Sequence, residues 1–206
     1  MCIRDSCTGA GATMLLIEFS SYHNKFLPVP KAMEEELMKL FQTESVPGGL
    51  FTLLFAVGIA PAICEELFMR GAVLSGLRQR LGVWSSVILV GLLFGILHIS
   101  VYRILPRALL GGVITYVVIR TGSVYAGMLM HGLNNCFAVL LVTGNVPSFV
   151  NTALDVEKVE TSGLPLLTLG VAVGLFVVGV VLVEWDGGRP KRSFTWTSTI
   201  EDKDEP

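Results

Sequence analysis

The stretch LFTLLFAVGIAPAICEELFMRGAVLSGL, residues 50–77, decides the fold class of this chain. It is long enough to cross a bilayer as a helix, which takes roughly 20 predominantly apolar residues. Near its middle it carries three ionisable side chains, Glu65, Glu66 and Arg70. Each such group costs about 2.5 kcal/mol or more inside a membrane. Their concentration in one spanning segment therefore predicts a functional site within the bilayer.

The composition of the whole chain agrees with a membrane protein. Of the 206 residues, 52% are hydrophobic and 16% are charged, against about 25% charged residues in an average soluble domain. Four further apolar stretches approach the spanning length, at 83–100, 105–119, 123–142 and 164–183. We expect an all-α, polytopic transmembrane bundle with about five spanning helices. The net charge of −2 and the lack of a basic cluster argue against a nucleic-acid partner.

The chain divides into three parts by composition. Residues 1–47 form an N-terminal juxtamembrane segment, 48–184 the membrane domain, and 185–206 a polar C-terminal tail. Within the first part, residues 30–42 have the pattern of an amphipathic helix, which suits either a helix on the membrane surface or an ordinary linker. The opening residues resemble an arbitrary start, so we expect either a truncated chain or a misassigned initiator, in which case any spanning helices upstream are missing.

Spacing gives the two adjacent glutamates different surroundings. Glu66 and Arg70 are four residues apart, so they share a helix face and can form an ion pair that offsets the cost of burying both charges. Glu65 is rotated by about 100° from Glu66 and has no cation at helical spacing. A carboxylate that is free of such a partner can serve as a general base.

Two later segments contribute further polar groups. Phe94 and His98 are four residues apart, so the phenyl ring can pack against the imidazole. His131 and Asn135 have the same spacing, which places an imidazole and an amide side by side, facing one cavity. Together with Glu65, these groups suffice to activate a water and to stabilise an oxyanion.

Each pattern alone has a simpler structural explanation. A Glu–Arg pair at helical spacing is often only a tie between helices, and a single hydrogen-bonded histidine in a membrane is common. The glycines of these segments permit close helix packing. The occurrence of all three patterns in spanning segments favours a catalytic site.

Three segments occur in order along the chain, EELFMR at 65–70, FGILH at 94–98 and HGLNN at 131–135. This set closely resembles the signature EExxxR, FxxxH and HxxxN of the CAAX-protease and bacteriocin-processing family, also called the CPBP or ABI family. The family includes type II CAAX prenyl endopeptidases and lysostaphin-resistance-like proteins. The resemblance covers about residues 50–142 and matches every signature position. It is specific for the family and not for a substrate.

The resemblance implies an intramembrane endopeptidase that hydrolyses peptide bonds of membrane-associated or prenylated, CAAX-type substrates. The expected partners are a hydrophobic or lipid-anchored peptide and the lipid bilayer, and the expected location is a prokaryotic cell membrane, with several spans. The implied roles are general base for Glu65, proton transfer for His98, structural support for Glu66 and Arg70, and oxyanion stabilisation for His131 and Asn135.

The family has been described both as metal-dependent and as glutamate-dependent. This sequence favours the second description, because it has no HExxH helix and because a glutamate paired with Arg70 is a poor zinc ligand. We therefore expect no cofactor. Zinc is the alternative, and its ligands would be Glu65, His98 and His131.

Two other functions use the same residues. A membrane transporter or proton-relay subunit could employ the buried carboxylate and imidazoles, although transporters usually show paired repeats and none is visible here. A catalytically idle bacteriocin-immunity scaffold could also keep the motifs.

Overall fold

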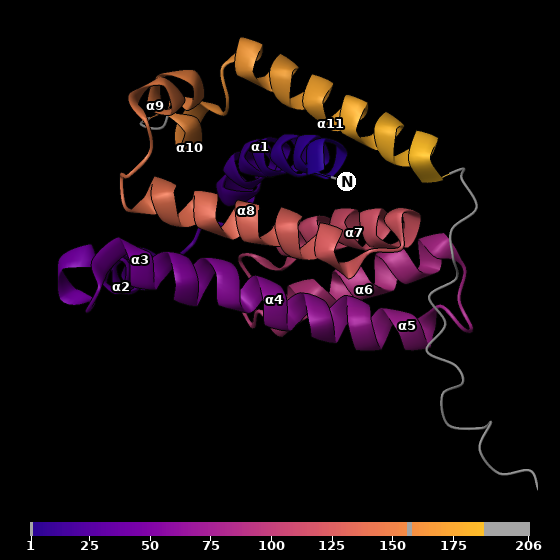
Figure 1. The fold of residues 1–206 in the computed structure, drawn as a ribbon. Coiled ribbons are helices and arrows are strands. Elements are labelled where there is room, and N and C mark those ends of the chain that lie inside the picture. Colours follow the sequence, from indigo (N-terminus) through magenta and orange to yellow (C-terminus); the bar gives the residue numbers. More distant parts are fainter. Residues whose placement is uncertain (1, 156–157, 188–206) are drawn as a thin grey trace, which may run out of the picture.

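The structure is a computed structural model that describes residues 2–155 and 158–187, and within these ranges it is helical, with no strand (Figure 1). The part of the predicted polar tail from residue 188 onward lies outside the described residues. The elements are, in order, α1 (Cys2–Phe26), α2 (Lys31–Leu40), η1 (Thr43–Ser45), α3 (Gly49–Leu53), η2 (Leu54–Ile59), α4 (Ala60–Glu66), η3 (Leu67–Val73), α5 (Leu74–Leu77), α6 (Val83–Leu97), α7 (Ile104–Thr121), α8 (Val124–Val142), α9 (Ser148–Leu154), α10 (Val159–Ser162) and α11 (Leu166–Gly187).

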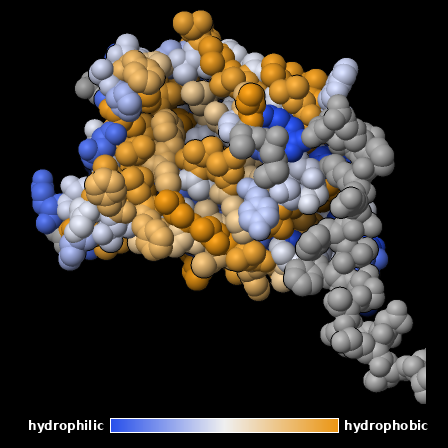
Figure 2. All heavy atoms as spheres, viewed as in Figure 1, coloured by the Kyte–Doolittle hydropathy of each residue, from blue (hydrophilic) through white to orange (hydrophobic). Residues whose placement is uncertain are grey.

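The predicted helical membrane bundle is confirmed. Four helices of the described chain are long and apolar enough to cross a bilayer: the continuous helix Gly49–Leu77, α7, α8, and the part of α11 up to Trp185. The remaining expected segment is α6, which is apolar but has 15 residues. Apolar residues also cover much of the outer surface (Figure 2), and Phe51 and Leu166 are 85% and 87% exposed. Such a surface suits contact with lipid.

The helix that carries the glutamates is not a regular α-helix throughout. Its segments η2 and η3 are π-helical, a rare conformation that occurs frequently at functional sites. Pro61 is the second residue of α4, after η2, and cannot donate the backbone hydrogen bond to Val57, four residues earlier. The irregular turns therefore flank α4, the segment that ends with the two glutamates.

Helix α1 packs inside the bundle, between α8 and α11 (Figure 1). The sequence predicted only a juxtamembrane segment here, because the apolar stretch 12–19 is short and contains Glu18. Small residues explain the difference: a Cβ on Gly11 would lie 2.5 Å from the backbone nitrogen of Phe176 in α11. Glu18 is accommodated because its carboxylate accepts the backbone N–H of Leu164, at 2.5 Å.

At the other end of the bundle, α7 is tied to α11 by polar contacts. Arg120 and Tyr116 of α7 both donate hydrogen bonds to the carboxylate of Glu184. Trp84, at the start of α6, stacks on the Tyr116 ring with the centroids 5.4 Å apart. Three helices are thus joined near the C-terminal end of α7.

Glycines of α6 allow α7 to approach it very closely. A Cβ on Gly91 would lie 2.7 Å from the carbonyl oxygen of Ala108, and one on Gly95 would lie 2.5 Å from that of Ile104. Contacts of this kind, between small residues, are typical of membrane helix pairs. They bring the first turn of α7 beside the end of α6, where His98 follows.

We expect Gly95→Ala to lower the free energy of unfolding by about 1–3 kcal/mol, the usual cost of overpacking. The matched control is Gly76→Ala in α5, where a Cβ would meet nothing within 4 Å. Thermal unfolding of both variants in detergent measures the difference. Equal melting temperatures would show that the α6–α7 contact is looser than described.

Candidate active site

A buried ion pair lies at the centre of the site. The Arg70 Nη1 group donates to Glu66 Oε1 over 2.8 Å, and neither side chain has any exposed area. The Nη2 group of Arg70 donates to the carbonyl oxygen of Gly111 in α7, also over 2.8 Å. The guanidinium lies over the Phe94 ring, 5.0 Å from its centroid. The predicted pairing is confirmed, and it connects the first spanning helix to α6 and α7.

His131 completes this buried cluster from α8. Its Nδ1 lies 3.0 Å from Glu66 Oε1, and the residue is 2% exposed. Because the carboxylate oxygen is the acceptor, Nδ1 must carry the proton of this hydrogen bond. Glu66 Oε1 thus receives hydrogen bonds from both Arg70 and His131. The Nε2 atom of His131 points to the other glutamate, 3.9 Å from Glu65 Oε2.

His98 is oriented in a similar way by the end of α6. Its Nδ1 lies 2.8 Å from the carbonyl oxygen of Phe94, and since a carbonyl can only accept, Nδ1 carries the proton. The Nε2 atom lies 3.8 Å from Glu65 Oε2. The Phe94 ring contacts both imidazoles edge-on, with centroid distances of 4.8 Å to His98 and 5.3 Å to His131. The expected packing on His98 is confirmed, and the contact with His131 was not predicted.

Glu65 therefore faces the Nε2 atoms of two imidazoles. Its side chain is 38% exposed, compared with 24% for His98 and 2% for His131. Separations of 3.8 and 3.9 Å are too long for direct hydrogen bonds, which span about 2.7–3.2 Å. In neutral rings, all three atoms accept hydrogen bonds. A water molecule has two protons and can donate to only two of these three atoms. If Glu65 Oε2 and both Nε2 atoms are to hold the same water, one of the three must carry a proton and donate it.

A cavity of about 230 Å³ opens beside this group. Apart from Glu65 and His98, its lining is apolar, formed by Phe68, Met69, Phe94 and Leu97. The side chains of Phe68 and Leu97 are 57% and 56% exposed, so they lie at the outer surface. The cavity therefore suits an apolar ligand chain that extends to the polar side chains of Glu65 and His98.

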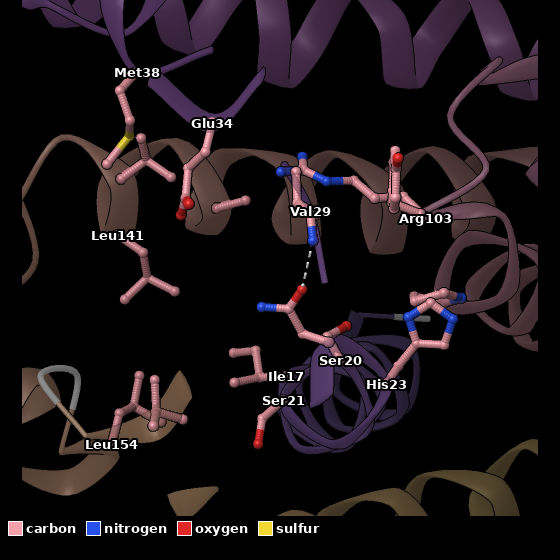
Figure 3. Close-up of a pocket in the computed structure, with 16 residues that line it drawn as sticks. Ile17, Ser20, Ser21, His23, Val29, Glu34, Met38, Arg103, Leu141 and Leu154 are labelled. Atoms are coloured by element: carbon pink, nitrogen blue, oxygen red, sulfur yellow. Dashed lines mark hydrogen bonds between the residues drawn. The ribbon is translucent and has the colours of Figure 1, made fainter. Parts of the chain in front are cut away.

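A larger cavity, of about 460 Å³, lies elsewhere, between α1, α2 and the ends of α7 and α8. Figure 3 shows Met38, Leu141 and Ile17 around it, with the polar side chains of Glu34 and Arg103. None of the six predicted site residues lines this cavity. The larger size of this cavity is therefore no reason to assign the reaction to it.

The donor set predicted for an alternative zinc ion only partly fits a metal. Both histidines have Nδ1 fixed by a partner, as is usual for metal ligands. However, the described residues hold no group of three His, Cys, Asp or Glu side chains that could bind a metal ion. The separations of 3.8 and 3.9 Å exceed the roughly 3.4 Å between two ligands of a tetrahedral zinc. We therefore assign no role in the reaction to a metal ion.

Asn135 makes its hydrogen bonds apart from the other five predicted residues. Its Nδ2 donates to the carbonyl oxygen of Val57, at 3.4 Å, which is the carbonyl that Pro61 cannot satisfy. Its Oδ1 accepts from Asn134, at 3.3 Å, and Asn134 in turn accepts from Thr13 of α1. Inside a membrane each backbone carbonyl needs a donor. Asn135 thus has a structural function, and its oxyanion function stays a prediction.

Two glycines that the sequence did not single out for the site create the space it needs. A Cβ on Gly127 of α8 would lie 2.7 Å from Glu66 Oε2, and one on Gly111 would lie 2.8 Å from the Cβ of Phe94. Any larger residue would displace the glutamate or the ring. The sequence offers no signal for this, because glycines in membrane helices are common for packing reasons alone.

We expect Arg70→Ala to lower the free energy of unfolding by about 3–5 kcal/mol, because it leaves Glu66 as an uncompensated buried charge. The control is Lys39→Ala, which breaks the exposed Lys39–Glu36 pair of α2 and should cost at most about 1 kcal/mol. Thermal unfolding in detergent compares the two. If both variants melt like the wild type, the buried pair contributes nothing.

Comparison with known proteins gives a match to a family model and to a relative. A family model described as type II CAAX prenyl endopeptidase Rce1-like matches residues 47–137. An uncharacterized protein of Mycoplasma capricolum subsp. capricolum is 30% identical over 120 residues, which cover 55% of this chain and 34% of that protein. The chain thus spans about a third of the length of this relative. No solved structure matches.

The family match includes all three motifs and the five side chains that the structure brings together. The resemblance drawn from the motifs is thereby confirmed: residues 47–137 match the model of the Rce1-like type II CAAX prenyl endopeptidase family.

Proposed function

We propose that this chain is the catalytic part of an intramembrane endopeptidase that hydrolyses membrane-associated or prenylated, CAAX-type peptides. The observation that carries the proposal is the convergence of the Glu65 carboxylate and the Nε2 atoms of His98 and His131 beside an apolar cavity. The family match supports hydrolysis as the class of reaction.

Glu65 is the general base in this proposal. A water held by Glu65 and His98 gives one proton to the Glu65 carboxylate while its oxygen bonds to the carbonyl carbon of the scissile peptide. The carbonyl oxygen becomes an oxyanion. When the C–N bond breaks, the leaving nitrogen takes the proton from Glu65, directly or relayed through Nε2 of His98, and the carboxylate is restored. The exposure of Glu65, at 38%, leaves room for both water and substrate.

The protonated form of His131 stabilises the oxyanion. Its Nδ1–H already donates to Glu66, so a second proton on Nε2 allows the ring to donate to the oxyanion as well. With that proton on Nε2, His131 becomes a hydrogen-bond donor. The water then faces two acceptors, Glu65 and His98, instead of three. Asn135 retains a second amide N–H beyond the one given to Val57, and we assign it a supporting part in the same task.

Arg70 and Phe94 hold these groups in place. The guanidinium fixes Glu66, which in turn fixes the ring of His131. The Phe94 ring lies against both imidazoles. Catalysis requires that the reacting groups hold their positions without reorganisation, and this arrangement supports such rigidity. We place the protease domain at 48–184 and the whole protein in a prokaryotic cell membrane.

We expect Glu65→Gln to lower the cleavage rate by about 100-fold or more, because it removes the general base while keeping the shape of the side chain. The assay is cleavage of a fluorescence-quenched prenylated peptide in detergent, with thermal unfolding measured in parallel. Glu35→Gln, on an exposed position of α2, is the control and should cleave like the wild type. Retention of more than about a tenth of the activity would exclude Glu65 as the base.

We also expect the purified protein to keep its activity in EDTA, because the proposed mechanism holds the water by hydrogen bonds to Glu65 and His98, and the described residues include no group of three side chains that could bind a metal ion. Elemental analysis of the chelator-treated, active enzyme is the measurement. One zinc per chain, with activity lost on chelation and regained when zinc is added back, would contradict the mechanism and support a metalloprotease.

A further inference from the structure

Two arginines at the start of α7 lack partners. Arg103 caps the helix and Arg107 lies one turn later, and the guanidinium groups have no hydrogen bond or ion pair among the described residues. Both residues are partly buried. Like charges four residues apart on a helix repel each other, and a helix N-terminus disfavours cations. By contrast, Arg70 and Arg120 are each paired with a glutamate.

The first turn of α7 lies beside the reacting groups. A Cβ on Gly95 would lie 2.5 Å from the carbonyl oxygen of Ile104 and 3.0 Å from the Cβ of Ala108. This contact holds the turn that contains Arg107 against the last turn of α6, directly before His98. Arg107 is close enough to interact electrostatically with both Glu65 and His98.

The two arginines differ in their surroundings. Arg103 lines the larger cavity, as Figure 3 shows, together with Glu34 and His23. Arg107 does not line it and lies nearer to the catalytic groups. In the loop that leads from His98 to Arg103, the hydroxyl of Ser100 is buried and has no hydrogen-bond partner. This stretch therefore combines two cations and a hydroxyl, none of them satisfied by the described residues.

We propose that Arg107, assisted by Arg103, binds the α-carboxylate of the substrate peptide, so that the enzyme selects peptides with a free C-terminus close to the scissile bond. The inference rests on the proposed endopeptidase function. A guanidinium presents a planar pair of N–H groups that matches a carboxylate. The anion would also relieve the repulsion between the two arginines.

The position favours a peptide carboxylate over a lipid headgroup. A group bound at Arg107 lies at the first turn of α7, which packs against the last turn of α6 directly before His98, near where the scissile bond must be held for attack. A lipid phosphate at this place would compete with the substrate. The carboxylate of a peptide that is cut near its end instead arrives together with the scissile bond.

The test compares two quenched peptides of the same sequence, each with a prenylated cysteine near its end, one with a C-terminal carboxylate and one with a C-terminal amide. Hydrogen bonds to a charged group contribute about 1.5–3 kcal/mol, which corresponds to roughly 10- to 150-fold. We expect wild-type kcat/KM to favour the acid by that factor, mainly through KM. Arg107→Ala should cut the acid as slowly as the amide, and Arg107→Lys should restore part of the difference.

The control is Arg78→Ala, in the turn after α5, where the side chain donates only to the Leu81 carbonyl oxygen. It should discriminate between acid and amide like the wild type. The wild-type comparison needs no variant, so the proposal stays testable if Arg107→Ala does not fold.

Other outcomes would overturn the inference. Equal cleavage of acid and amide by the wild type would exclude recognition of the carboxylate. An equal loss on both peptides in Arg107→Ala would assign Arg107 to the positioning of His98. A dependence on anionic lipid that Arg107→Ala removes, with acid and amide cut alike, would assign it to a headgroup. If the wild type cuts neither peptide, the endopeptidase function itself fails.

Discussion

The buried ion pair between Glu66 and Arg70 is the interaction on which the rest of the site depends. Burying two charges in an apolar medium costs several kcal/mol for each ion unless geometry and additional hydrogen bonds compensate. Here the compensation comes from three helices, because Gly111 supplies a carbonyl and His131 supplies a donor. The pair itself lies within one helix, so a separation of α7 or α8 would leave it buried without the hydrogen bond to Gly111 or from His131. These hydrogen bonds hold the relative positions of the first spanning helix, α7 and α8.

This constraint separates two adjacent residues of identical chemistry. Glu66 accepts hydrogen bonds from Arg70 and His131 at Oε1, and no part of its side chain is exposed. Glu65 points instead to the free Nε2 atoms of His98 and His131 and to a cavity. A carboxylate that is buried and paired with a guanidinium is held in place, whereas one that faces acceptors can hold and deprotonate a water. The proposed division of work between structure and catalysis follows from these surroundings.

Much of the fold follows from patterns within single segments. Hydropathy predicts the spanning helices because the bilayer demands a minimum apolar length, and the segments 83–100, 105–119 and 123–142 agree closely with α6, α7 and α8. Hydropathy missed the packing of α1, whose small residues allow an approach to α11 that apolar length does not indicate. The Glu66–Arg70 pair and the Phe94–His98 contact are also local, since residues four apart on one helix must be neighbours.

What the sequence by itself determined is therefore the membrane bundle, the buried pair and the identity of the groups near the site. Only the tertiary structure decided that Glu65 meets His98 and His131, that Asn135 binds the carbonyl opposite Pro61, and that the first turn of α7 lies beside them. The physical reason is that periodicity defines the faces of a helix but not its rotation or its shift along a neighbour. Close contacts between glycines and backbone atoms set those two quantities, and they depend on every helix in the bundle at once.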